Sequence, residues 1–180
     1  MRASTIFATV ATAFTLTAAS PSASRQSNTT LTNFLLVTTS QRSSTTESSQ
    51  LTNASATSLF DPFNQESYYL RTISAGYGSL PRFNLTNGDL HTLAMGIEGV
   101  GEYVYNSTGK IEAGKEFVLS PSKEPAGNLA LADGYLLTVS GEEEGWTICD
   151  GDLGQDVLYW KGNGTSCTPT YIHAVADAPY

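Results

Sequence analysis

The sequence predicts an all-β fold that forms a single compact barrel or sandwich. After Asn33, short runs of β-branched and aromatic residues alternate with Gly, Asn and Asp. No stretch keeps the 3.6-residue apolar period of an amphipathic helix for three turns. Sixteen glycines and seven prolines interrupt the runs at a spacing typical of sandwiches and barrels. A length of 180 residues fits one domain.

The N-terminal residues have the features of a secretory signal peptide. Arg2 precedes an apolar stretch, Thr5–Ala18, which is too short to cross a bilayer and is followed by small residues. We expect residues 1–24 to be the signal, with cleavage after residue 19 or 24, and residues 25–32 to be a linker. Because no GPI-type tail is recognisable, we expect a secreted protein without a membrane anchor, free or held at the cell wall.

Residues 33–180 are expected to form the β domain. Between its first two strands, more than half of residues 38–58 are Ser or Thr, so this stretch has little apolar surface to bury and is predicted to be a solvated loop. The apolar runs predict strands at Phe34–Thr39, Tyr68–Ile73, Phe83–Leu85, Leu90–Ala94, Tyr103–Tyr105, Glu116–Leu119, Asn128–Ala132, Tyr135–Val139, Trp146–Cys149, Val157–Lys161 and Thr170–Val175.

Two decapeptides within the domain share a pattern. FNLTNGDLHT (Phe83–Thr92) and LALADGYLLT (Leu129–Thr138) begin 46 residues apart. Asn-Gly and Asp-Gly between apolar runs predict β-hairpins with type I′ turns, in which both central residues have φ > 0. The offset divides the domain into three similar parts, so a β-trefoil-like fold is the leading specific prediction, and another barrel or sandwich is the alternative. The parts are Thr32–Gly78, Ser79–Ala126 and Gly127–Val175.

Cys149 and Cys167 are the two cysteines of the chain. In an oxidising compartment a single pair usually forms one bridge, although two free buried thiols are the alternative. A bridge here would stabilise the fold by about 3 kcal/mol in the chain-entropy model. Two cysteines without a nearby histidine do not provide the three or four ligands of a zinc site.

Composition and sequons agree with an extracellular protein. The net charge is −8 with nine Lys and Arg, which disfavours nucleic acid and anionic membranes because both require a cationic surface. Each N-x-S/T sequon is a candidate surface position for an N-linked glycan. The sequons lie at Asn28, Asn53, Asn84, Asn106 and Asn163.

Candidate catalytic and metal-binding residues are few. His91 and His173 each lie in a predicted strand, and no Gly-x-Ser-x-Gly motif supports a serine hydrolase. Asp150 and Asp156 could act as paired carboxylates in glycoside hydrolysis, but spacing in a turn does not fix the separation that this reaction needs. The segment DGDLGQD (Asp150–Asp156) has oxygen ligands at alternating positions, as calcium-binding loops do, but it lacks the terminal bidentate Glu of an EF-hand loop. We therefore expect no catalytic residue, no metal site and no cofactor.

Aromatic residues near the disulfide are the candidate ligand-binding residues. Trp146, Tyr159 and Trp160 lie close together in sequence, and exposed aromatic rings on a rigid β scaffold can stack on sugars. Tyr159 and Trp160 are adjacent, so in a strand they face opposite sides and at most one of them packs inward. The alternative is that a Trp beside the disulfide belongs to the core.

Several short motifs resemble a known family. The opening strand NFLLVTTS, the DGYLL hairpin and the GWTI strand with its nearby cysteine are similar to small secreted fungal cell-wall proteins of the phialide-protein (PhiA-like) type. The resemblance implies a glycosylated protein associated with the cell wall and without known catalysis. It transfers no functional residue to this chain.

The leading hypothesis is therefore a secreted, glycosylated, non-enzymatic extracellular protein that contacts cell-wall polysaccharide or wall proteins. A lectin-like carbohydrate-binding module with a site near Tyr159 or Trp160 is the first alternative. Further alternatives are a secreted hydrolase that uses Asp150 and Asp156, and a protease inhibitor that presents the loop Gly76–Phe83. The sequence leaves the oligomeric state open.

Overall fold

The computed structural model describes residues 27–43, 50–62, 67–74, 76, 79–96, 99–107, 109–123 and 125–179. Within these ranges the chain forms one antiparallel β-sheet with short 3₁₀ turns such as η3 (Asp152–Gly154), which confirms the predicted all-β class. The expected signal peptide lies outside the described residues. No helix among the described residues has the length and hydrophobicity to cross a bilayer.

The strands follow the predicted order along the chain. They are β1 (Ser27–Asn28), β2 (Thr30–Thr39), β3 (Ser55–Phe60), β4 (Tyr68–Ile73), β5 (Phe83–Thr86), β6 (Asp89–Met95), β7 (Glu102–Ser107), β8 (Lys115–Glu116), β9 (Val118–Ser120), β10 (Leu129–Ala132), β11 (Leu136–Val139), β12 (Trp146–Asp150), β13 (Asp156–Trp160), β14 (Thr168–Pro169) and β15 (Tyr171–Val175).

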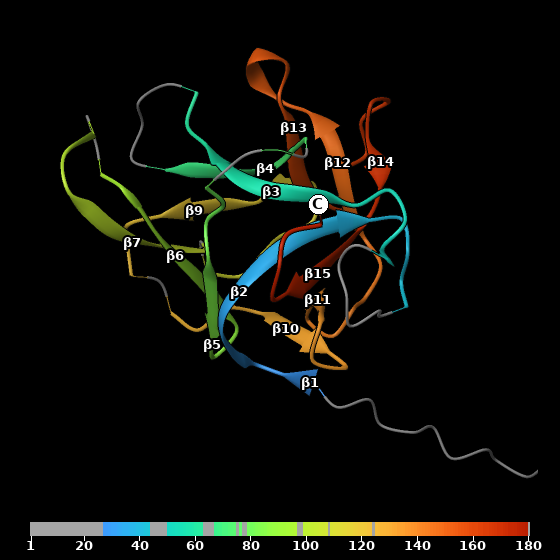
Figure 1. Ribbon diagram of the computed structural model, residues 1–180, viewed down its shortest axis with the longest axis horizontal. Coiled ribbons are helices and arrows are strands. Elements are labelled where there is room, and N and C mark those ends of the chain that lie inside the picture. The colour runs from blue at the N-terminus through green and yellow to red at the C-terminus, as the bar shows by residue number, and fades with distance from the viewer. Residues whose placement is uncertain are drawn as a thin grey trace, which may run out of the picture.

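The long strand β2 organises one part of the sheet. It pairs with β15 on one side and with β5 on the other, and the path continues through β11 and β10 to β1. In Figure 1 these strands occupy the centre and lower part of the molecule. The pairing β5–β6 and the pairing β10–β11 are the two hairpins that the repeated decapeptides predicted.

The turns of these two hairpins have the predicted geometry. Asn87 and Gly88 have φ of 52° and 78°, and Asp133 and Gly134 have φ of 54° and 80°. Positive φ at both central positions is the signature of a type I′ turn. Gly127 packs against the first turn, where a Cβ would lie 2.1 Å from the carbonyl oxygen of Gly88, so this close approach requires glycine.

Three further strand pairs, β3–β4, β7–β9 and β12–β13, lie beyond this part of the sheet. Their strands join because β4 pairs with both β9 and β13, and β8 pairs with β13. At the junction, Leu70 donates its N–H to the carbonyl of Phe117 at 2.9 Å, and Phe117 donates to the carbonyl of Leu158 at 2.7 Å. All three side chains are fully buried. We call this joined set of strands the cap.

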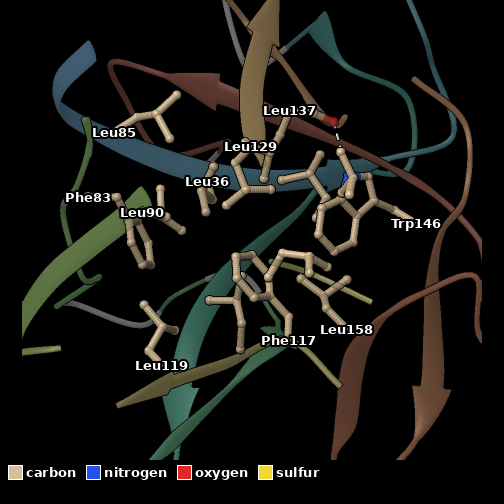
Figure 2. Packing of buried hydrophobic residues seen from close by; sticks show 14 of the residues in the cluster. Leu36, Phe83, Leu85, Leu90, Phe117, Leu119, Leu129, Leu137, Trp146 and Leu158 are labelled. Atoms are coloured by element: carbon tan, nitrogen blue, oxygen red, sulfur yellow. Dashed lines mark hydrogen bonds between the residues drawn. The ribbon is translucent and has the colours of Figure 1, made fainter. Parts of the chain in front are cut away.

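Side chains from the cap and from the strands around β2 meet in one hydrophobic core. Figure 2 shows Phe117 and Leu158 of the cap facing Leu36 and Leu129, with the indole of Trp146 beside them. Trp146 donates its Nε1–H to the carbonyl of Leu137 at 3.0 Å, so its one polar group is satisfied inside the core. Each large apolar side chain buried in this way contributes about 1.5–3 kcal/mol.

The structure differs from the prediction at two boundaries. The expected linker 25–32 contains β1, which pairs with β10, and the start of β2. The expected loop 38–58 contains the end of β2 and the first residues of β3. Thr57 explains how a polar sequence becomes a strand, because it is buried and donates its Oγ1–H to the carbonyl of Leu36 at 3.1 Å. Residues 44–49 of this stretch lie outside the described residues.

Candidate functional site

The predicted disulfide is present. Cys149 on β12 is bridged to Cys167, which immediately precedes β14. Because β14 also pairs with β12, the bridge and the strand pairing together hold this segment against the cap. Gly162 passes close by, and a Cβ there would lie 2.8 Å from Cys149 Sγ.

Both tryptophans belong to the core. Trp146 is 0% exposed and Trp160 is 3% exposed. The two indoles form an edge-to-face pair with centroids 5.1 Å apart, and Phe117 stacks on Trp146 at 5.3 Å. A buried ring cannot stack on a sugar, so the expectation that Trp146 or Trp160 contacts a ligand is wrong for this structure, and the core alternative describes both residues.

Tyr159 remains as a candidate, because it points to the other side of β13. It is partly exposed, as expected for the residue next to an inward-facing Trp160. Its hydroxyl donates to Glu116 Oε1 at 2.8 Å. Partial burial, followed by this hydrogen bond, raises the pKa of Tyr159 to about 12, so the phenol keeps its proton at physiological pH.

Strand register places three more side chains on the same face. Glu116 lies directly opposite Tyr159 on β8, and Tyr69 on β4 lies opposite Val118. Opposite residues of an antiparallel pair share a face, and so do residues two apart along a strand. Arg71, two residues from Tyr69, lies opposite Val157, which is two residues from Tyr159 on β13, so Tyr69 and Arg71 share the face of Tyr159. We call these four residues, Tyr69, Arg71, Glu116 and Tyr159, the Tyr159 face.

The side chains of the Tyr159 face interact with charged and polar neighbours. Burial raises the pKa of Tyr69, and the negative charges of Glu116, Asp152 and Asp61 raise it further. Arg71 places its guanidinium 5.2 Å from the ring centre of Phe60 and donates a hydrogen bond to the side chain of Gln155. The face therefore combines two partly exposed phenol rings with hydrogen-bonding groups of both kinds.

The sequence reasoning found Tyr159 but missed Tyr69, Arg71 and Glu116. The alternation in YYLRTI (Tyr68–Ile73) was a usable signal, because Tyr69 and Arg71 share a side of the strand and Leu70 does not. Which side faces the core depends on how the cap strands join, and no local pattern specifies that.

A hollow of about 370 Å³ borders the Tyr159 face. Glu116 is shared by the hollow and the face, so a chain-like ligand could extend from one to the other. The hollow is lined by Lys110, Ile111, Glu112, Lys115, Glu116 and Val118.

The carboxylates considered for hydrolysis lie elsewhere. Asp150 and Asp156 are directly opposite each other where β12 ends and β13 begins, and both are exposed. Neither lines the hollow beside the Tyr159 face. Within the part of the chain that the structure describes, no three His, Cys, Asp or Glu side chains are grouped so that they could hold a metal ion.

The two histidines have different surroundings. His173 on β15 is 1% exposed, its ring packs edge-to-face on Tyr135 at 5.0 Å, and its Nε2 has no hydrogen-bond partner among the described residues. Burial lowers the pKa of His173 to about 4. His91 is partly exposed on β6 opposite Asn106, and both line a hollow of about 700 Å³.

The sequons differ in exposure. Asn28, Asn53 and Asn163 are exposed, and Asn84 is partly exposed. Asn106 is only 9% exposed and donates its Nδ2–H to the carbonyl of Ser122 at 3.4 Å. Because a glycan bonds to Nδ2, the structure disfavours Asn106 as a glycosylation site, against the sequence expectation that it lies at the surface.

The loop considered for protease inhibition, Gly76–Phe83, lies partly outside the described residues. Its second half, from residue 79 to residue 82, lines a third hollow of about 770 Å³, which is bounded by β5 and β6.

Comparison of the chain with protein-family models, with curated proteins and with solved structures found no match.

Proposed function

We propose that this chain is a secreted, glycosylated, non-enzymatic extracellular protein that contacts cell-wall polysaccharide through the Tyr159 face. The observation that carries the proposal is the pairing of Tyr159 with Glu116 beside Tyr69 on rigid, hydrogen-bonded strands. A lectin-like role and a wall-associated role are then one function, because the same face would hold the protein in the wall.

The chemistry of the face fits a polysaccharide. Phenol rings offer apolar surfaces to the C–H faces of sugars, and their hydroxyl groups can bond sugar hydroxyls. Glu116 accepts hydrogen bonds, and Arg71 donates them. Because Tyr159 and Glu116 already hold each other in place, little side-chain freedom is lost when a ligand binds.

Retention on insoluble polysaccharide tests the proposal. The purified protein, with its glycans, is incubated with chitin, β-glucan and mannan, and the bound fraction is measured together with that of Tyr159→Ala. Tyr171→Ala is the matched control, because Tyr171 is also a partly exposed strand tyrosine whose hydroxyl approaches a glutamate, Glu144, at 3.5 Å.

We expect at least one polysaccharide to retain the wild type and Tyr171→Ala, and to retain Tyr159→Ala less. Absence of retention on all three would refute the proposal. Release of soluble sugar during the incubation would favour the hydrolase alternative, and inhibition of a protease panel would favour the inhibitor alternative.

We propose further that the strand pairing is that of a β-trefoil. The two hairpins with positive φ at Asn87-Gly88 and Asp133-Gly134 support this assignment. So does the chain of backbone bonds through Leu70, Phe117 and Leu158, one from each part of the predicted three-fold division. The Leu129 N–H donates to the Gly88 carbonyl at 3.1 Å, which brings β10 beside the β5–β6 turn. In a trefoil, β6 and β10 would be neighbours in a closed barrel made of β2, β5, β6, β10, β11 and β15. A crystal structure in which β6 and β10 lie on separate sheets would contradict this assignment.

A further inference from the structure

The outer side of the β6–β7 hairpin exposes large apolar side chains. Leu93 is 62% exposed, Met95 is 57% exposed and Val104 is 48% exposed. Leu93 and Val104 are directly opposite each other, and Met95 follows Leu93 at two residues, so all three share one face. We call them the apolar strip. Exposed apolar groups that cluster in this way mark a surface that something covers, or a surface that aggregates.

A sequon asparagine lies on this same face. Asn84 on β5 is directly opposite His91, which precedes Leu93 by two residues. Asn84, Leu93 and Met95 line one hollow of about 770 Å³. Of the five sequon asparagines, Asn84 is the one that borders this hollow.

The amide of Asn84 is already oriented. Its Oδ1 accepts a hydrogen bond from the backbone N–H of Asn33 at 2.9 Å. The other amide atom, Nδ2, has no hydrogen-bond partner among the described residues, and Nδ2 is the atom to which an N-linked glycan is attached. Asn106, which lies opposite His91 on β7, instead uses its Nδ2 in a hydrogen bond.

We propose that an N-linked glycan on Asn84 fills this hollow and covers the apolar strip. Nδ2 attacks the anomeric carbon of a lipid-diphosphate oligosaccharide, the donor of the secretory pathway. The N–C bond forms, the C–O bond to the diphosphate breaks, and the amide proton leaves with the lipid diphosphate. The first sugars then lie over Leu93 and Met95, where their C–H faces replace water. The inference rests on the secretion that is part of the proposed function, but not on polysaccharide binding.

Thr86, the third residue of the sequon, provides a test that leaves Asn84 in place. Thr86 is exposed, so Thr86→Ala removes the sequon without changing the bond between Asn84 and Asn33. Thr86→Ser is the matched control, because serine preserves the sequon. The proteins are secreted from a eukaryotic host, and each is analysed by glycopeptide mass spectrometry, by fluorescence of the apolar dye ANS and by size-exclusion chromatography.

We expect a glycan at Asn84 in the wild type and in Thr86→Ser, with weak ANS fluorescence and a monomeric elution volume. Thr86→Ala should show ANS fluorescence that is several-fold stronger and should elute earlier. Adding Leu93→Ser and Met95→Ser to Thr86→Ala should return both signals to the wild-type level. Should Thr86→Ala not be secreted, endoglycosidase treatment of the folded wild type gives the same readout.

Three results would overturn the inference. They are an unmodified Asn84 in the wild type, equal ANS fluorescence with and without the glycan, and a glycosylated wild type that is a dimer through the apolar strip. Binding to polysaccharide by the Tyr159 face is measured separately, so either proposal can fail while the other stands.

Discussion

His173 makes the stability of the fold depend on pH in a defined window. Its imidazole is 1% exposed and packs on Tyr135, and burial lowers its pKa from 6.5 to about 4. In the unfolded chain the imidazole takes up a proton as the pH falls below 6.5, whereas in the folded protein it stays neutral until about pH 4. The unfolded state therefore binds more protons between these values, and the free energy of unfolding decreases as the pH falls through the window.

The size of this effect follows from the shift. One pKa unit corresponds to about 1.4 kcal/mol, so His173 should contribute a loss of about 3 kcal/mol between pH 7 and pH 4. This is a large part of the ~5–15 kcal/mol that stabilises a typical domain. Carboxylates titrate in the same range, so the contribution of His173 must be measured as a difference between variants.

Urea unfolding at pH 7, 5.5 and 4 measures that difference. His173→Leu keeps an apolar side chain at the site and removes the titrating group, so its loss of stability on acidification should be about 3 kcal/mol smaller than that of the wild type. His91→Leu is the control, because it makes the same substitution at a partly exposed histidine on another strand. Equal pH dependence in His173→Leu and the wild type would refute the reasoning.

Three other predictions concern the disulfide, the core and the sequons. Replacing both cysteines by alanine should lower the free energy of unfolding by about 3 kcal/mol, measured by urea unfolding, because the bridge closes a loop with a sequence separation of 18. Trp146→Phe should cost at least ~1–3 kcal/mol in the same assay, because the buried carbonyl of Leu137 loses its partner; a smaller loss would contradict the packing seen here. Glycopeptide mass spectrometry should find a glycan at Asn163 and none at Asn106, and occupancy of Asn106 would show that its side chain is accessible when the chain is modified.

The local features of the fold could be read from the sequence. Turn chemistry predicted the two hairpins, since Asn87-Gly88 and Asp133-Gly134 tolerate the positive φ that a type I′ turn needs. Runs of β-branched and aromatic residues located most strands to within one or two residues. β3 was missed because its Ser and Thr side chains have weak apolar character, and it becomes a strand only through pairing with β2 and β4.

The candidate site could be predicted only in part. Adjacency in a strand implied that Tyr159 and Trp160 face opposite sides, and the burial of Trp160 bears this out. The burial of Trp146 depends on its packing against Phe117 and Trp160. The meeting of Tyr69, Glu116 and Tyr159 depends on pairing between strands about 45 residues apart. Such contacts are fixed by packing of the whole cap, which no window of the sequence contains.

The central claim is that Tyr159 contacts a polysaccharide. The most direct measurement is the Kd of a soluble oligosaccharide cut from whichever polysaccharide retains the protein, determined by calorimetry for the wild type, Tyr159→Ala and Tyr171→Ala. Loss of one stacked aromatic ring, at about 0.5–1.5 kcal/mol, should raise the Kd of Tyr159→Ala by about two- to tenfold and leave that of Tyr171→Ala unchanged. Equal Kd values for Tyr159→Ala and the wild type would contradict the claim and place any binding site elsewhere on the molecule.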